Sequence, residues 1–304
     1  MVAKPRLRAE TGIAAPVAAL VLGAVAMGIS PVFVRYASAD VGPFASAFWR
    51  VCLALPVLYA WMRIEEARTP RSARPRAFTR PVVLAGVVFA GDLLFWHLAI
   101  LNTTVANATF LCTLAPLFVV LVVWLVLGQR VSRGTWIGLA LCLAGGAALI
   151  GESLQADPGR IRGDIYGIVT AVFFALYFVF VGRARETSGA ARVTFEAGIV
   201  TAGCILAVAL AFEPRVLPQT WPGLAALLAM ALISHAGGQG LLSVALGRLP
   251  AVFSSLVIFL ETVAAALFGW ALLGEPVSLV QALGGVLILG GIWTARPKPE
   301  ATLS

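Results

Sequence analysis

Several ionisable side chains lie inside long apolar stretches of the sequence, where a charge is costly. At the centre of a bilayer a charged residue costs at least ~2.5–3.5 kcal/mol on insertion scales, so such residues are retained where they pair or bind something. A carboxylate there can meet an ammonium group, and a guanidinium can neutralise an acid or bind a carbonyl. The residues of this kind are Arg50, Asp92, His97, Glu196, His235 and Glu261.

The two acids Asp92 and Glu261 are the first candidates for binding a charged ligand. Glu261 lies mid-stretch with no charged residue close in sequence, so we expect it to meet the ammonium group of a substrate. The alternative is a protonated carboxyl group bonded to a neighbouring helix. Asp92 either binds substrate or links two helices. About 140° of helical rotation separates it from His97, so the two do not neutralise each other and one should face a cavity.

The histidines and Arg50 have a structural interpretation beside the binding one. His97 and His235 can each bond to a backbone or hydroxyl group, and we favour that role while keeping both as binding candidates. Arg50 is expected to neutralise an acidic group or bind a carbonyl rather than contact substrate. Glu196 lies near the end of its stretch and is expected either to extend its carboxylate to the membrane surface or to pair locally.

Aromatic and amide side chains complete the candidate site. Trp96, next to His97, offers a flat face for stacking an aromatic or apolar substrate. Tyr177 and Phe174 are possible partners, with core packing an equal alternative for Phe174. Gln239 and Asn102 offer neutral hydrogen bonds to a zwitterion. The predicted substrate-binding residues are Trp96, Asp92, His97, Tyr177, Glu261, Gln239 and His235.

Prolines and glycines interrupt some of these stretches. Proline removes a backbone donor and kinks a helix, while glycine lets backbones flex or approach closely. A gating role and simple close packing both explain the glycine cluster. The candidate hinge residues are Pro31, Pro116, Gly237, Gly238 and Gly240, with Pro56 a further interruption.

The sequence has no signature of an enzyme or of a metal or cofactor site. A phosphate loop, an H-E-x-x-H pattern and a nucleophile elbow are all missing. The four cysteines fall in apolar stretches without paired spacing, so we interpret them as packing residues. We therefore expect neither a cofactor nor a metal, and no nucleotide-driven pump.

The composition predicts that these residues are positioned by membrane-spanning helices. Hydrophobic residues make up 60% of the chain and charged residues 12%, about half the charged share of a soluble domain. Apolar stretches close to the ~20 residues that cross a bilayer recur through the chain. There are ten of them, at 13–34, 43–62, 81–102, 105–127, 134–151, 164–182, 193–212, 222–246, 250–273 and 277–295.

An internal repeat organises these stretches. Trp124–Ser132 reads WLVLGQRVS, and Trp270–Ser278, 146 positions later, reads WALLGEPVS. Because five stretches, an odd number, fall in each half, the second unit must enter the membrane from the opposite face. We predict an all-α polytopic membrane protein of ten transmembrane helices, built as two inverted five-helix repeats around a central cavity. The first repeat covers 1–151, a connector 152–163, and the second repeat 164–304.

The charge distribution predicts the orientation. With the N-terminus inside, the inner loops carry most of the basic residues, and the outer side keeps Arg35, Arg160, Arg162 and Arg215. This bias places both termini in the cytoplasm and the connector in the periplasm. The basic stretch 68–80 is then a topology signal, and since Phe78 is the single aromatic residue among its arginines, nucleic-acid binding is not expected.

The chain resembles the drug/metabolite transporter superfamily, in particular its EamA-type exporters. The resemblance rests on the ten stretches, on the repeated W-x-x-L-G-x-x-V-S, and on the run 105–109 followed by Leu114-Ala115-Pro116-Leu117. Within this branch the chain looks most like bacterial exporters of aromatic and neutral amino acids. The second copy departs from the pattern, with Glu261-Thr262 in place of Ala115-Pro116.

The resemblance implies a secondary transporter in the bacterial inner membrane that exports small metabolites, amino acids above all, by alternating access. Its partners would be the substrate and the lipid bilayer; the oligomeric state stays open, and a monomer is compatible with the sequence. One alternative is proton-coupled efflux of cationic drugs or nucleosides through Glu261. Another is a membrane enzyme or scaffold, which the missing catalytic cluster and the short connectors disfavour.

Overall fold

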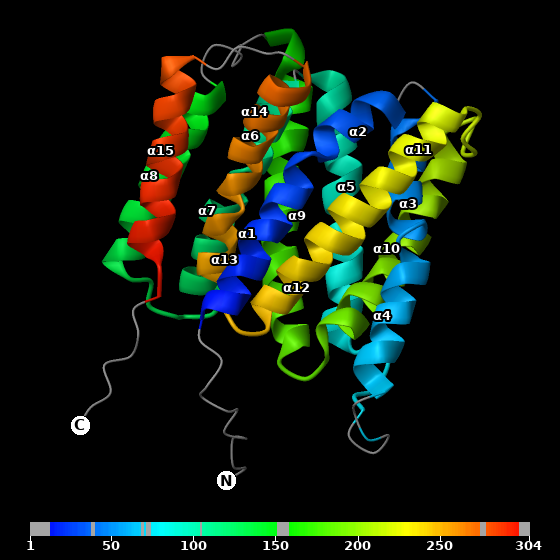
Figure 1. The fold of residues 1–304 in the computed structure, drawn as a ribbon, viewed down its shortest axis with the longest axis horizontal. Helices are drawn as coiled ribbons and strands as arrows, with labels where there is room; N and C mark the ends of the chain where they lie inside the picture. Colours follow the sequence, from blue (N-terminus) through cyan, green and yellow to red (C-terminus); the bar gives the residue numbers. More distant parts are fainter. Residues whose placement is uncertain are drawn as a thin grey trace.

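The computed structural model describes residues 13–37, 40–67, 70, 74–103, 105–150, 158–273 and 278–297, and all regular structure within them is helical. The helices lie side by side and run between an upper and a lower end of the molecule (Figure 1). Helix α1 begins and α15 ends at the lower end. The all-helical prediction is confirmed. A bundle of helices suits a bilayer, because each helix satisfies its own backbone groups.

The helices divide into a first and a second group along the chain. The first group is α1 (Ala14–Gly28), α2 (Ser30–Ala37), α3 (Pro43–Cys52), α4 (Leu55–Ala67), α5 (Arg80–Asn102), α6 (Val105–Cys112), α7 (Ala115–Leu121), the π-helix η2 (Val122–Val126) and α8 (Arg133–Ile150). The second group is the short η4 (Pro158–Arg160), α9 (Ile161–Arg185), α10 (Ala190–Phe212), α11 (Trp221–Ala229), the π-helix η5 (Met230–Gln239), α12 (Gly240–Leu246), α13 (Ala251–Val257), α14 (Phe259–Leu273) and α15 (Leu279–Ala295).

Seven segments in the described residues are long and apolar enough to cross a membrane: Ala14–Val34, Pro43–Ala67, Arg80–Asn102, Ile161–Arg185, Ala190–Phe212, Trp221–Leu246 and Ala251–Phe268. Three shorter apolar helices, Phe110–Val126, Arg133–Leu149 and Leu279–Ala295, match the remaining predicted stretches. The chain is therefore a multi-pass membrane protein by length and composition. The count of ten spans stays a prediction, as do the repeat boundaries. Residues 152–157 of the predicted connector and Gly274-Glu275-Pro276 lie outside the described residues.

Several helices are interrupted midway, and three of the interruptions precede a proline. The breaks lie between α1 and α2 before Pro31, between α3 and α4 before Pro56, and between α6 and α7 before Pro116. The fourth break, at Ile258 between α13 and α14, has no proline and comes just before Glu261. Proline explains the first three, since it cannot donate to the preceding turn.

The repeated motif places a helix cap in each half. Ser132 Oγ accepts a hydrogen bond from the Thr135 backbone N–H, 3.1 Å away, ahead of α8. Ser278 Oγ accepts from the Gln281 backbone N–H, 3.2 Å away, ahead of α15. The last residue of each motif copy thus satisfies a free N–H group in the first turn of the following helix.

Helices α8 and α15 touch backbone to backbone through glycines. A Cβ added at Gly145 would lie 2.5 Å from Gly284 O, and one at Gly284 2.6 Å from Gly145 O. The pair Gly138 and Gly291 shows the same reciprocal contact, at 2.5 and 2.6 Å. Only glycine permits an approach this close. Membrane helices associate largely through van der Waals packing, and small residues at their interfaces let the backbones come together.

Two glutamates cap helices of the opposite half. Glu65, at the end of α4, accepts hydrogen bonds from the Ala190 and Ala191 backbone N–H groups at 3.2 and 3.1 Å, where α10 begins. Glu213, after α10, accepts from the Phe44 and Ala45 N–H groups at 2.7 Å each, where α3 begins. The carboxylates satisfy free N–H groups and favour the positive helix ends, so α10 is tied to α3 and α4 at both ends.

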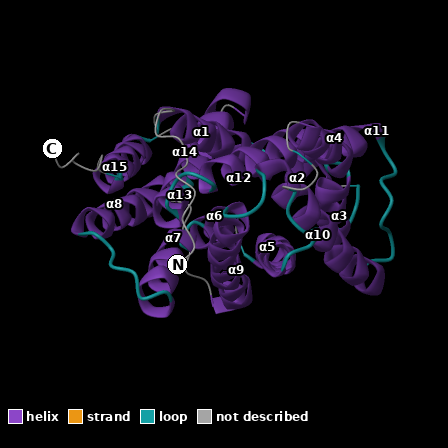
Figure 2. Ribbon diagram, turned by 90° about the horizontal axis from the view of Figure 1, so that it is seen from below, coloured by secondary structure: helices purple, strands orange, loops and turns teal. Residues whose placement is uncertain are grey.

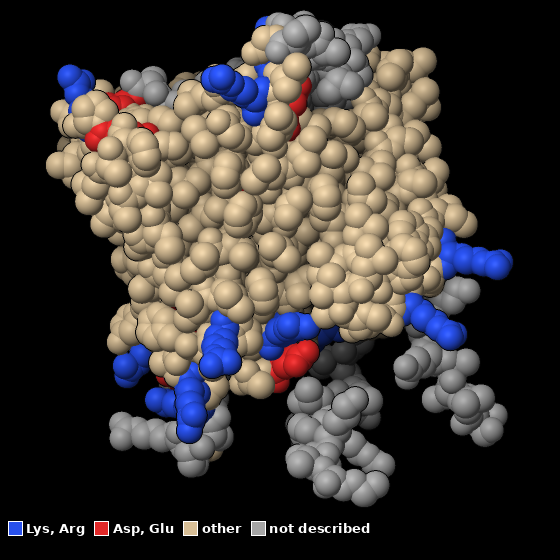
Figure 3. Space-filling model, turned by 180° about the vertical axis from the view of Figure 1, so that it is seen from behind, with Lys and Arg blue, Asp and Glu red and all other residues tan. Residues whose placement is uncertain are grey.

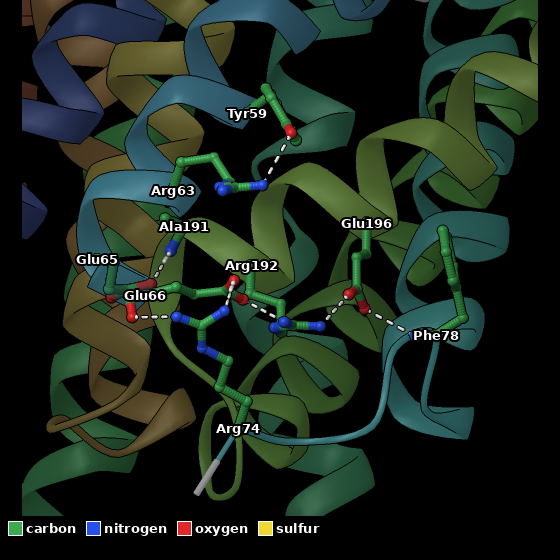
Figure 4. A network of polar contacts seen from close by, with 9 residues as sticks. All are labelled: Tyr59, Arg63, Glu65, Glu66, Arg74, Phe78, Ala191, Arg192 and Glu196. Carbon is green, nitrogen blue, oxygen red and sulfur yellow. Dashed lines mark hydrogen bonds and ion pairs between the residues drawn. The ribbon is translucent and has the colours of Figure 1, made fainter. Parts of the chain in front are cut away.

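Charged side chains gather at the two ends of the molecule. The face in Figure 3 shows a broad uncharged band between an upper and a lower charged rim, with most of the basic residues low. At the lower end Arg192 bridges Glu66 and Glu196, and Glu196 accepts from the Phe78 backbone N–H at 2.8 Å (Figure 4). The predicted local pairing of Glu196 is confirmed. The band is what a bilayer's hydrocarbon core requires.

Adjacent glycines of α15 test the backbone contact. Gly291→Leu would place a side chain against Gly138 O and Cys142 Sγ, each 2.6 Å from the added Cβ, and we expect it to destabilise the fold by about 1–3 kcal/mol or more. Gly290→Leu is the control, because nothing lies within 4 Å of a Cβ there. Thermal unfolding in detergent measures both. Equal melting temperatures would contradict the proposed packing.

Candidate functional site

A small cavity of about 40 Å³ lies between helices from both halves of the chain. One water molecule needs roughly 10–15 Å³ of such space, so the cavity holds a few water molecules and has no room for an amino acid in the present conformation. Its wall combines charged, amide, hydroxyl and aromatic groups. The lining residues are Met27, Ser30, Arg50, Phe89, Asp92, Leu93, Trp96, Cys112, Phe174, Gln239 and Glu261.

The local helix geometry explains why these side chains meet. On α5, Phe89, Asp92 and Trp96 lie three and four residues apart, which places them on one face of the helix. Glu261 stands in the first turn of α14, directly after the break at Ile258. Gln239 ends the π-helix η5, a type of helix found mostly at functional sites.

Three charged groups share the cavity wall. Arg50 and Asp92 are 5% and 6% exposed, and Arg50 lies close enough to Glu261 and Asp92 for their charges to interact. The Arg50 Cζ atom is 6.0 Å from the Trp96 ring centroid, within the range of a cation–π contact. The expectation that Arg50 neutralises acidic groups fits this placement, but Arg50 also lines the cavity itself.

Several polar atoms on this wall have no partner among the described residues. They include Ser30 Oγ, Arg50 Nε and Gln239 Oε1, all buried. A buried polar group left unbonded costs about 1–3 kcal/mol. Three such atoms around one cavity indicate a place where a polar ligand or water completes the hydrogen bonds.

Three predicted binding residues form a layer behind the wall. The rings of Tyr177 and His235 each stack on the Phe89 ring, with centroid distances of 4.6 and 5.7 Å. His97 Nδ1 lies 2.6 Å from Leu93 O, and its ring meets the Trp96 ring edge-on at 5.1 Å. None of the three lines the cavity, so their contacts orient Phe89 and Trp96. For His97 this matches the favoured backbone-bonded role.

His235 differs from that expectation. Neither ring nitrogen has a hydrogen-bond partner in the described residues, although the side chain is only 2% exposed. The hydrogen bond expected for His235 is therefore not found, and its visible contact is the stack on Phe89. Asn102 also departs from expectation: it is exposed, and its amide donates to Leu98 O rather than toward the cavity.

None of the candidate hinge residues lines the central cavity itself. Pro31 lines a smaller space of about 20 Å³ beside Trp96 and Glu261. A Cβ on Gly238 would lie 2.5 Å from Met27 Cγ, which supports the packing explanation for that glycine. For the remaining residues, Pro116, Gly237 and Gly240, a gating role stays a prediction.

Sequence reasoning missed Ser30 and Cys112 as cavity residues. Both stand directly beside a helix break, Ser30 after Ile29 and Cys112 before Thr113. A polar residue next to an expected proline kink is the signal that could have found them. Among the described residues, no three His, Cys, Asp or Glu side chains are grouped so as to hold a metal ion.

A double-mutant cycle tests the shared charge. Arg50→Met removes a buried guanidinium whose charge interacts with those of two acids, and we expect a loss of about 3 kcal/mol, the scale for leaving a buried charge without its opposite charge. Adding Glu261→Gln to Arg50→Met should restore part of the lost stability, because it removes one of the acids that Arg50→Met leaves without a nearby positive charge. Thermal unfolding in detergent gives the coupling. Strictly additive effects would show that the two groups act independently.

Comparisons with known proteins agree with this architecture. The model of the EamA-like transporter family matches residues 15–151 and 161–295. An uncharacterized transporter of Archaeoglobus fulgidus is 28% identical over 280 residues, covering 91% of this chain and 95% of the relative. The pseudopaline exporter CntI of Pseudomonas aeruginosa is 26% identical over 270 residues, covering 88% and 91%.

One solved crystal structure shares the fold, with a TM-score of 0.80 at 19% identity over 93% of this chain and 98% of the other. The family match accounts for both halves of the chain and confirms the resemblance to EamA-type transporters, while the placement among amino-acid exporters stays a prediction. It supports a transport function, with a small-molecule substrate and membrane lipid as partners. The chain belongs to the EamA-like transporter family.

Proposed function

We propose that this transporter exports small zwitterionic metabolites, with aromatic and neutral amino acids as the substrate class. The observation that carries the proposal is the cavity wall that joins Arg50 to Asp92 and Glu261. A guanidinium can hold a carboxylate, and an acid can hold an ammonium group. Trp96 and Phe174 add flat apolar faces on which an aromatic side chain can stack.

The size of the cavity supports the proposal of transport by alternating access. At about 40 Å³ it has no room for an amino acid, so the helices must separate before substrate binds. The breaks at Ile29, Thr113-Leu114 and Ile258 interrupt helices that supply the wall. Interrupted helices near the midplane are a recurrent feature of secondary transporters.

The proposed frame is ten spans in two inverted five-helix repeats. Two reciprocal glycine contacts support this frame, Gly138 with Gly291 and Gly145 with Gly284. In the sequence, the repeat offset of 146 positions relates Gly138 to Gly284 and Gly145 to Gly291, so the repeat exchanges the two contacts. The caps from Glu65 and Glu213 follow the same reciprocal pattern at opposite ends of the bundle. A pseudo-two-fold axis in the membrane plane would produce such pairs.

The proposed location is the inner membrane of a bacterium, with the lower end and both termini in the cytoplasm. The basic residues gathered at the lower end support this orientation. Among the relatives, one carries the name of an exporter, which favours the outward direction of transport.

Proton-coupled efflux of a cationic drug or nucleoside is the second candidate. Two acids on the wall favour it, but Arg50 offsets one of their charges. A ligand carrying only positive charge offers no anion to the Arg50 guanidinium. A zwitterion offers a carboxylate to Arg50 and an ammonium group to the acids, so it matches the charges of the wall better.

Reconstituted liposomes test the substrate class. Labelled phenylalanine and threonine should cross faster than in protein-free vesicles, and Arg50→Gln, Asp92→Asn or Glu261→Gln should each lower the flux about tenfold or more. That factor corresponds to losing one charged contact of roughly 1.4 kcal/mol.

Glu196→Gln is the matched control, since Glu196 is a buried acid that pairs at the lower end and does not line the cavity. It should leave the Michaelis constant near the wild-type value. Amino-acid flux no faster than in protein-free vesicles would overturn the substrate class. Flux of a cationic drug driven by a pH gradient would favour the second candidate.

A further inference from the structure

A second and larger cavity opens at the lower end of the bundle, the end onto which Figure 2 looks. Its volume is about 520 Å³, within the range of about 300–1,000 Å³ typical of small-molecule sites. We call it the lower vestibule. Its wall includes Gln129, Gly182, Arg183, Arg185, Glu186 and Val252.

The lower vestibule is separate from the central cavity but shares helices with it. On α9, Phe174 lines the central cavity and Gly182 the vestibule, eight residues or about 12 Å further along the helix. Between these two positions Tyr177 and Phe178 are 3% and 0% exposed. A layer of buried rings therefore divides the two spaces.

Two opposite charges on the vestibule wall have no visible partner. Arg183 and Glu186 are both exposed, and within the described residues the structure shows no side-chain hydrogen bond or ion pair for either. Their spacing of three residues at the end of α9 places them on the same side of the helix. Together they present one cation and one anion to the vestibule.

The neighbouring guanidinium of Arg185 is bonded to the wall of the vestibule itself. Arg185 Nε donates to Ser243 O at 2.8 Å, and its Nη1 donates to Ser188 O. These bonds tie the end of α9 to α12 and to the loop before α10. They leave Arg183 as the vestibule arginine that can reach a ligand.

We infer that the lower vestibule is a second binding site for the zwitterionic substrate, where Arg183 holds the carboxylate and Glu186 the ammonium group. The inference rests on the proposed function, because it extends the same substrate class to a new place. The vestibule binds the substrate at the lower face. The layer of rings around Tyr177 must open before the substrate can move from the vestibule into the central cavity.

A glycine in the wall allows a direct steric test. Nothing lies within 4 Å of a Cβ added at Gly182, so Gly182→Leu fills vestibule space without a clash. We expect it to lower flux from the lower face about tenfold, with an unchanged melting temperature. Gly203→Leu is the matched control: Gly203 is mid-helix in α10, exposed, away from the vestibule, and equally free of neighbours.

Charge variants test the chemistry of the site in liposomes of known orientation. Arg183→Gln should raise the Michaelis constant for phenylalanine offered at the lower face about fivefold, the ratio for losing one charge contact of about 1 kcal/mol in water. The maximal rate of transport from the lower face should not change, nor should the Michaelis constant for phenylalanine offered at the upper face. Glu186→Gln should act the same way, and high salt should reduce both effects because these charges are exposed.

Arg162→Gln is the control, an exposed arginine at the other end of α9. A wild-type chain that carries phenylalanine while Arg183→Gln and Gly182→Leu behave like their controls would overturn the vestibule site and leave the proposed function standing. An equal change at both faces would also overturn it. A wild-type chain that carries no amino acid removes both proposals.

Discussion

The placement of charge inside an apolar bundle is the constraint on which the rest of this structure depends. Arg50, Asp92 and Glu261 come from three different helices, and each would be strongly disfavoured alone in hydrocarbon. Together they offset part of one another's charge, and the cavity between them keeps polar atoms within reach of water or ligand. The helices can therefore pack around these residues only in an arrangement that brings all three to one place.

Close contacts elsewhere hold that arrangement. Helices α8 and α15 meet through glycines whose backbones touch, and α10 is capped to α3 and α4 at both ends. Such contacts leave no space for sliding, because protein interiors are packed as densely as organic crystals. Helices with breaks in their backbone hydrogen bonding, α3 among them, supply the cavity wall.

The two cavities differ in a way that suits a transporter in a closed conformation. The central cavity is small and its wall carries charged and aromatic side chains, whereas the lower vestibule has a volume of about 520 Å³. The family supplies the general activity, transport of a small molecule. A fold shared by many proteins does not set the substrate, so the proposed specificity rests on side chains such as Arg50 and Trp96.

The sequence by itself determined the helices, the proline breaks and most of the polar candidates, because apolar length, proline and buried charge act locally. The 146-residue spacing of the repeated motif also separates Gly138 from Gly284 and Gly145 from Gly291, but the contacts between α8 and α15 appear only in the structure. Only the tertiary structure decided which candidates meet. Asp92, Trp96, Gln239 and Glu261 line the cavity, while His97, His235 and Tyr177 lie behind it. The physical reason is rotation: in helices that are apolar on every side, the face turned inward is set by packing against neighbours, which no single stretch of sequence contains.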